Sequence, residues 1–150
     1  MQDLKETCRL ALVQASPVMF DKAASLKKAL TWIENSAAQG AELVVFPELF
    51  LPGYPFGMTF GFKVGSRDEE GRKDWKLYYD NSVVCPGAET EALGAAAKKH
   101  HIYLSIGVSE RDDTTGTLYN TNIMFTPDGT LASIHRKLKP TGAERFVWGD

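Results

Sequence analysis

The sequence predicts an α/β fold in which a mixed sheet carries helices on one face. The first fifty residues alternate an apolar strand, an amphipathic helix and a second apolar strand, and this β-α-β order implies a parallel pair with a right-handed crossover. After a later helix, closely spaced strands around a tight turn indicate an antiparallel hairpin. Both helices can cover the same side of such a sheet, which gives a layered arrangement. A length of 150 residues suits one domain with a sizeable core.

The N-terminal third defines the parallel pair. Residues 8–15 form an apolar run that is typical of a central strand. Asp21 is the expected N-cap of the helix, and Gly40 is its expected stop. Between them, apolar residues recur at three- and four-residue steps and give one apolar stripe: Leu26, Ala29, Leu30, Ile33 and Ala37. Residues 43–46 are the second strand, which Pro47 stops because proline cannot donate to a sheet ladder.

The middle of the chain is less regular. Residues 53–71 contain five glycines, and aromatic residues at Tyr54, Phe56, Phe60 and Phe62. A loop of this length is usually functional or disordered, and the aromatic residues argue against disorder, so we expect it to fold over a site or a partner. Residues 68–82 mix charged and aromatic side chains and predict a partly exposed helix. Residues 90–100 predict a second amphipathic helix, whose basic end suits the helix dipole.

The last third is expected to be mainly sheet. Residues 102–108, 118–126 and 131–135 are the predicted strands. The turn at residues 127–129, Pro-Asp-Gly, joins the last two into a hairpin.

Composition excludes several classes of function. The net charge is −2 and no long basic run occurs, so nucleic-acid binding has no electrostatic basis. No stretch reaches the length of a membrane span, and residues 1–6 lack the apolar run of a signal peptide, so we expect no membrane partner and a cytoplasmic location. Cys8 and Cys85 are expected to be reduced thiols, and their spacing matches no metal motif.

Glu48 is the first candidate for catalysis. It follows a buried strand at once and has apolar neighbours in Phe46 and Leu49. Ligands of α/β proteins bind beyond the carboxyl ends of parallel strands, and removal from water would make this carboxylate a stronger base. The alternative interpretation is a solvated loop glutamate.

Lys137 is the second candidate, because it follows the last predicted strand directly. If it points into the same pocket as Glu48, its ammonium group keeps the acid ionised and offers a donor to an anion developing on a substrate. Glu144 lies within reach by sequence and is expected to orient the lysine. The alternative is an exposed basic turn with surface ion pairs.

Two motifs together carry a resemblance to a known family. The first is Phe46-Pro47-Glu48 with the following Pro52-Gly53-Tyr54-Pro55, and the second is residues 135–141, His-Arg-Lys-Leu-Lys-Pro-Thr, with Glu144-Arg145 and Trp148-Gly149. In this order, with Glu48 and Lys137 separated by 89 positions, they resemble the N-terminal half of a nitrilase, in the carbon–nitrogen hydrolase superfamily. The similarity runs over nearly the whole chain.

The resemblance implies half or more of an α-β-β-α sandwich and a Glu-Lys-Cys triad. Glu48 matches the general base, Lys137 the lysine that stabilises tetrahedral intermediates, Glu144 a second glutamate, and Tyr54 a residue lining the substrate pocket. A cysteine thiolate would attack a small organic nitrile, and the thioimidate and thioester that follow would yield a carboxylic acid and ammonia. The family requires no metal or organic cofactor, and its members commonly form homo-oligomers.

One departure limits this expectation. The nucleophile of the family lies some tens of residues beyond the lysine motif, after Asp150, so residues 1–150 are expected to be the N-terminal portion of a single hydrolase domain. Neither cysteine matches the nucleophile: Cys8 is expected in the core and Cys85 precedes Pro86-Gly87. Three alternatives stay open, namely a cyanide hydratase, an amidase, or an incomplete fragment that acts only by association through uncovered apolar surface.

Overall fold

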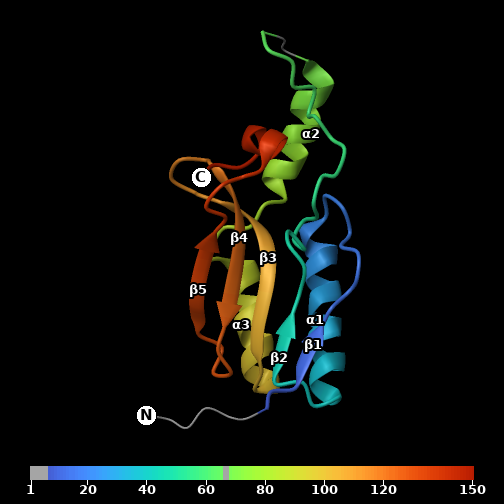
Figure 1. Ribbon diagram of the computed structural model, residues 1–150, viewed down its shortest axis with the longest axis vertical. Helices are drawn as coiled ribbons and strands as arrows, with labels where there is room; N and C mark the ends of the chain where they lie inside the picture. The colour runs from blue at the N-terminus through green and yellow to red at the C-terminus, as the bar shows by residue number, and fades with distance from the viewer. Residues whose placement is uncertain (1–6, 66–67) are drawn as a thin grey trace.

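The computed structural model describes residues 7–65 and 68–150 and contains a five-stranded mixed sheet (Figure 1). The strands lie side by side in chain order: β1 (Leu10–Leu12), β2 (Leu43–Val45), β3 (Tyr103–Arg111), β4 (Leu118–Phe125) and β5 (Leu131–Arg136). The pairs β1–β2 and β2–β3 are parallel, whereas β3–β4 and β4–β5 are antiparallel. This confirms the predicted α/β class and mixed sheet. The expectation for residues 1–6, and the part of the expected loop at residues 66 and 67, lie outside the described residues.

Two helices cover one face of the sheet, as predicted. They are α1 (Lys22–Ala38) and α3 (Ala88–His100), which bury Ile33 and Leu93 against Val44, Ile106 and Ile123 of the strands. A third helix, α2 (Glu69–Asp80), lies beyond one end of the sheet, near the short 3-10 helix η1 (Gly142–Phe146) (Figure 1). No helix of the described residues is long and apolar enough to cross a membrane.

The sheet face opposite α1 and α3 is open. Large apolar side chains on it are exposed, among them Leu10, Leu12, Tyr103 and Met124. The described residues therefore form one helical layer and one sheet layer of the expected sandwich.

Local chemistry explains where the helices begin. Asp21 Oδ1 accepts a hydrogen bond from Ala24 N at 2.8 Å, which confirms the predicted N-cap of α1. Asp68 caps α2 in the same way. Helix α3 begins two residues before the predicted Thr90, because the Thr90 hydroxyl accepts from Gly87 N and thereby lies inside the first turn.

The first strand differs from its prediction. It spans three residues at the edge of the sheet, not residues 8–15 at its centre, because within the described residues β1 pairs only with the short strand β2. Cys8 lies before this strand and is exposed, so its expected place in the core is wrong. By contrast, β3 continues three residues past Val108, because β4 pairs with it as far as Arg111.

Candidate active site

Glu48 and Lys137 meet because their strands end at the same edge of the sheet. Strand β5 is antiparallel to β4, as is β3, so β2, β3 and β5 all run in one direction (Figure 1). Lys137 Nζ lies 3.1 Å from Glu48 Oε1, and 2.9 Å and 3.2 Å from the two carboxylate oxygens of Glu144. The structure thus brings together the three residues predicted for catalysis.

The backbone around Glu48 is placed by a close approach to β3. A Cβ atom at Gly107 would lie 2.5 Å from Leu49 N and 2.7 Å from Glu48 Cα, so only glycine admits this crossing. Leu49 has a positive φ of 51° and is fully buried. A non-glycine residue in this region carries strain, which its burial holds in place.

Lys137 and Glu144 are fixed by the chain that leads from β5 into η1. Lys137 N donates to Asn120 O at 2.7 Å, which extends the β4–β5 pairing past the end of the strand. Glu144 Oε2 accepts from Thr141 N at 2.6 Å, so this carboxylate also caps the 3-10 helix that carries it.

The charged groups of the site change one another's pKa values. The hydrogen bond from the ammonium to Glu144, with that to Glu48, raises the pKa of Lys137 above its ordinary value. Burial acts to raise the pKa of Glu144, but hydrogen bonds from Thr141, Lys137 and Tyr54 outweigh it, and the pKa lies below its ordinary value. The site therefore keeps both groups charged at neutral pH.

Glu48 is less buried than predicted. Its neighbours Phe46 and Leu49 are buried, yet its own side chain is 49% exposed. The expected removal of this carboxylate from water is therefore wrong, and its contacts come from hydrogen bonding to Lys137 and Asn120.

Tyr54 contributes a hydroxyl to the charged cluster. Its hydroxyl donates to Glu144 Oε1 at 2.8 Å, and burial together with that hydrogen bond raises its pKa. The Tyr54 ring packs beside Trp148 and lines a cavity of about 300 Å³ with Phe56, Met58 and Phe60 of the loop that follows it and with Val147 after η1.

A larger cavity of about 560 Å³ lies over Glu48 and Lys137, whereas Glu144 and Tyr54 line the smaller one. The larger cavity is lined by Glu48, Gly107, Asn120, His135, Lys137 and Leu138, among others. Asn120 was not among the predicted site residues, although its amide lies 2.6 Å from Glu48 Oε1. The predicted strand of residues 118–126 carries two amides, Asn120 and Asn122, and only the register of the sheet decides which of them meets Glu48.

The comparison with known families agrees with this geometry. The sequence model for carbon-nitrogen hydrolases matches residues 9–150, nearly the whole chain. The chain belongs to the carbon-nitrogen hydrolase family.

Relatives within this family are named as nitrilases. The aliphatic nitrilase of Sinorhizobium fredii (strain HH103) is 50% identical over 141 residues, which cover 94% of this chain and 45% of that protein. Nitrilase 2 of Arabidopsis thaliana is 45% identical over 141 residues, which cover 94% of this chain and 41% of that protein. The tobacco (Nicotiana tabacum) protein named bifunctional nitrilase/nitrile hydratase NIT4B is 43% identical over 143 residues, covering 95% and 40%. The chain thus spans less than half the length of these relatives.

Solved structures show the same fold. The crystal structure of Saccharomyces cerevisiae Nit3, described as a member of branch 10 of the nitrilase superfamily, superposes with a TM-score of 0.71 at 30% identity. The superposition covers 95% of this chain and 48% of that one. This match supports a carbon-nitrogen hydrolase fold for the described residues.

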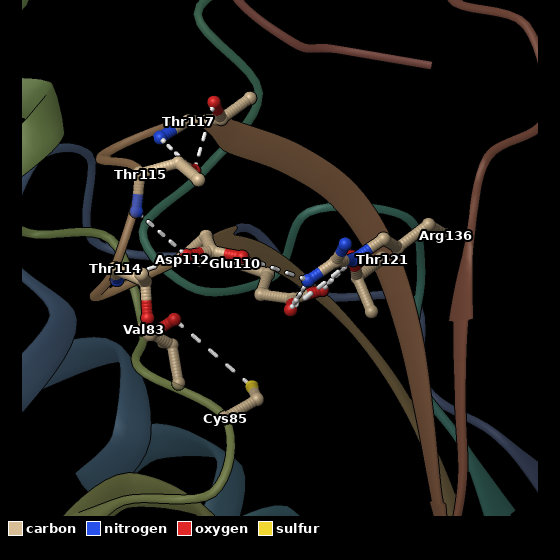
Figure 2. Close-up of polar contacts among 9 residues, drawn as sticks. All are labelled: Val83, Cys85, Glu110, Asp112, Thr114, Thr115, Thr117, Thr121 and Arg136. Carbon is tan, nitrogen blue, oxygen red and sulfur yellow. Dashed lines mark hydrogen bonds and ion pairs between the residues drawn. The ribbon is translucent and has the colours of Figure 1, made fainter.

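A second polar cluster lies beside the site, on the helix-covered face of this hydrolase sheet (Figure 2). Buried Glu110 accepts hydrogen bonds from Arg136 Nη2 at 2.6 Å and from Thr121 Oγ1 at 2.7 Å. Arg136 also stacks on the Tyr119 ring, 3.7 Å from its centre. The pair anchors the residue just before Lys137, so it helps to fix the end of β5.

The chemistry of the Cys85 thiol does not suit a nucleophile. Burial raises the pKa of the Cys85 thiol to about 12, which disfavours the reactive thiolate. Its Sγ contacts the carbonyl of Val83 (Figure 2). Within residues 7–65 and 68–150, no group of three or more histidine, cysteine, aspartate and glutamate side chains is placed to hold a metal ion.

Proposed function

We propose that residues 1–150 supply the base and lysine of a nitrilase-like hydrolase that converts a small organic nitrile into a carboxylic acid and ammonia. The observation that carries the proposal is the position of Lys137 Nζ between Glu48 and Glu144. An ammonium group held by two carboxylates supplies a fixed positive charge without becoming buried and unpaired. The names of the relatives favour nitriles over other substrates of carbon-nitrogen hydrolases.

Each residue of the cluster has its own role in the proposed reaction. Glu48 takes the thiol proton of a cysteine, and the sulfur adds to the nitrile carbon to form a thioimidate. Water then adds, ammonia leaves, and a second water hydrolyses the thioester, so two waters are consumed for each acid and ammonia formed. Lys137 stabilises the tetrahedral intermediates, Glu144 holds Lys137, and Tyr54 borders the substrate.

The cysteine belongs, in this proposal, to a part of the hydrolase domain beyond residues 1–150. The relatives match this chain over only 40–45% of their own length in the examples above, which supports the assignment of 1–150 as an N-terminal portion of one domain. No organic cofactor or metal takes part in the proposed reaction.

Two other functions have a specific observation in their favour. The relatives named bifunctional nitrilase/nitrile hydratase favour an amide as a second product. The exposed apolar side chains of the open sheet face, Leu12 and Tyr103 among them, favour a polypeptide that acts only by association.

The test uses a hybrid protein, in which residues 1–150 are joined to the C-terminal part of the Sinorhizobium fredii relative. We expect ammonia release from a panel of nitriles, with acid as the main product, and a loss of at least about 100-fold in Glu48→Gln and Lys137→Met. The matched control is Glu34→Gln, on the exposed side of α1. Ammonia release that is unaffected by both site variants contradicts the proposal, and turnover by residues 1–150 alone contradicts the association-only alternative.

A further inference from the structure

Asn120 contacts both residues that the proposed function places in catalysis. Its side-chain Nδ2 donates to Glu48 Oε1 at 2.6 Å, and its backbone oxygen accepts from Lys137 N at 2.7 Å. It lies within β4 and is only 5% exposed, so the surrounding strands fix its position. Asn120 therefore joins the base that follows β2 to the lysine that follows β5, the first through its side chain and the second through its backbone.

The hydrogen bonds to Glu48 fall on one of its two oxygens. Asn120 Nδ2 and Lys137 Nζ both donate to Oε1, at 2.6 Å and 3.1 Å. No side chain of the described residues donates to Oε2. The carboxylate is half exposed at the cavity of about 560 Å³, so the second oxygen is open to a reacting group.

We propose that Asn120 is a positioning residue that, together with Lys137, holds Oε1 of Glu48 and leaves proton transfer to Oε2. This inference rests on the proposed function of Glu48 as a general base. An oxygen that already accepts two hydrogen bonds, one of them from an ammonium group, is the weaker site for a further proton. The neutral amide of Asn120 stays a donor at every pH, so it holds the carboxylate throughout the reaction.

These separate roles of Oε1 and Oε2 define the path of the proton. The S–H bond of the attacking thiol breaks with its electron pair left on sulfur, and a new O–H bond forms at Oε2. That proton then moves to the nitrogen of the nitrile as sulfur adds to its carbon. Oε1 keeps its two hydrogen bonds through both steps, so the carboxylate does not rotate between them.

The first experiment uses the unsubstituted chain and needs no variant at Asn120. An NMR titration of the side-chain amides is expected to show the Asn120 NH₂ signal moving as Glu48 becomes protonated. Glu48→Gln is expected to abolish this movement. The Asn122 amide, which donates to Ser105 Oγ at 3.1 Å, is the internal reference on the same strand and face.

The second experiment measures catalysis in the hybrid protein. Asn120→Leu is close in size and cannot donate, so we expect kcat to fall about 10-fold or more while KM changes less than about 2-fold. The control Asn35→Leu lies on the exposed side of α1 and is expected to leave both constants unchanged. A residue needed only for folding would lower the amount of active enzyme, which active-site titration of the cysteine measures separately.

The outcomes separate this inference from the proposed function. The positioning role is overturned if the Asn120 NH₂ signal moves with pH in the same way in Glu48→Gln as in the unsubstituted chain. It is also overturned if kcat is unchanged in the Asn120→Leu hybrid. If the amide follows Glu48 but Glu48→Gln still releases ammonia at full rate, the proposed function fails and the contact between Asn120 and Glu48 stands.

Discussion

Lys137 is the residue on which the charged cluster depends. It contacts Glu48, which is 49% exposed, and Glu144, which is 11% exposed, so water screens the first contact much more than the second. The raised pKa of Lys137 means that its contribution to stability is present below the ordinary lysine value and is lost as the pH rises through the folded value. The lowered pKa of Glu144 means that its contribution is present above the ordinary glutamate value and is lost as the pH falls through the folded value.

Replacing Glu144 is expected to change the titration of the lysine. Glu144→Gln removes the hydrogen-bonded charge that contributes most to the shift, so the pKa of Lys137 should fall toward its ordinary value. An NMR titration of the ¹⁵N-labelled lysine Nζ signals measures this change. Glu34→Gln is the control, and an unchanged Lys137 titration in Glu144→Gln would show that the pair does not form.

The same substitution is expected to have a pH-dependent effect on stability. At pH 7 we expect Glu144→Gln to lower the free energy of unfolding by about 1–2 kcal/mol, because Glu144 is charged and bonded there. Below the ordinary glutamate pKa of about 4.3 the difference should shrink, because the native glutamate also becomes neutral. Urea denaturation at pH 7 and pH 3 tests this sign. A difference that grows on acidification contradicts it.

At the scale of the elements, the site is made by strand ends. Strands β2 and β5 run in one direction and place Glu48 and Lys137 at the same edge of the sheet, while η1 places Glu144 against Lys137. Gly107 of β3 is the point where the chain around Glu48 crosses the sheet. Backbone contacts between these elements therefore fix where the charged side chains leave the sheet.

Adding one methyl group at that crossing is expected to displace the base. Gly107→Ala places a Cβ atom against the backbone of Pro47, Glu48 and Leu49, which cannot move as a flexible side chain could. We expect a loss of about 1–3 kcal/mol in the free energy of unfolding, together with a weaker contact between Glu48 and Lys137. Chemical denaturation measures the first effect. Ser133→Ala, on exposed β5, is the control. Equal stability of the two variants would contradict the close approach of the Glu48 backbone to Gly107.

The sequence allowed the helices, four of the five strands and the meeting of Glu48, Lys137 and Glu144 to be predicted, because hydrophobic periodicity indicates the first two and the paired motifs indicate the third. The first strand was predicted too long, because an apolar run does not show how far its neighbour pairs with it. The sequence did not indicate Asn120 as part of the site, because a hydrogen bond between β4 and the end of β2 depends on the register of the sheet. The half-exposed state of Glu48 was also missed, because apolar neighbours in sequence can point away from a side chain.

The whole molecule has one covered and one uncovered sheet face. Helices α1 and α3 bury the first, whereas Leu12 and Tyr103 on the second are 72% and 48% exposed. Apolar side chains gathered on one face favour contact with another protein surface. The homo-oligomer expected of the whole hydrolase stays a prediction, and the open face bears only on how residues 1–150 behave by themselves.

Residues 1–150 are expected to associate through the open sheet face. Sedimentation velocity at micromolar concentration should show dimers or larger species, and Leu12→Lys with Tyr103→Lys should shift them toward monomer. Val64→Lys is the control, because Val64 is 95% exposed in the loop before α2. Monomers at all concentrations, or association that ignores both sheet substitutions, contradict this expectation.

The central claim is that Glu48 and Lys137 act as one catalytic unit. The most direct test is the rate of ammonia release by the hybrid protein carrying Glu48→Gln, Lys137→Met or both. Residues that act as a unit are non-additive, so the double variant is expected to lose no more than about the larger single loss. Losses that multiply in the double variant, or a single variant with the full rate, would contradict the claim.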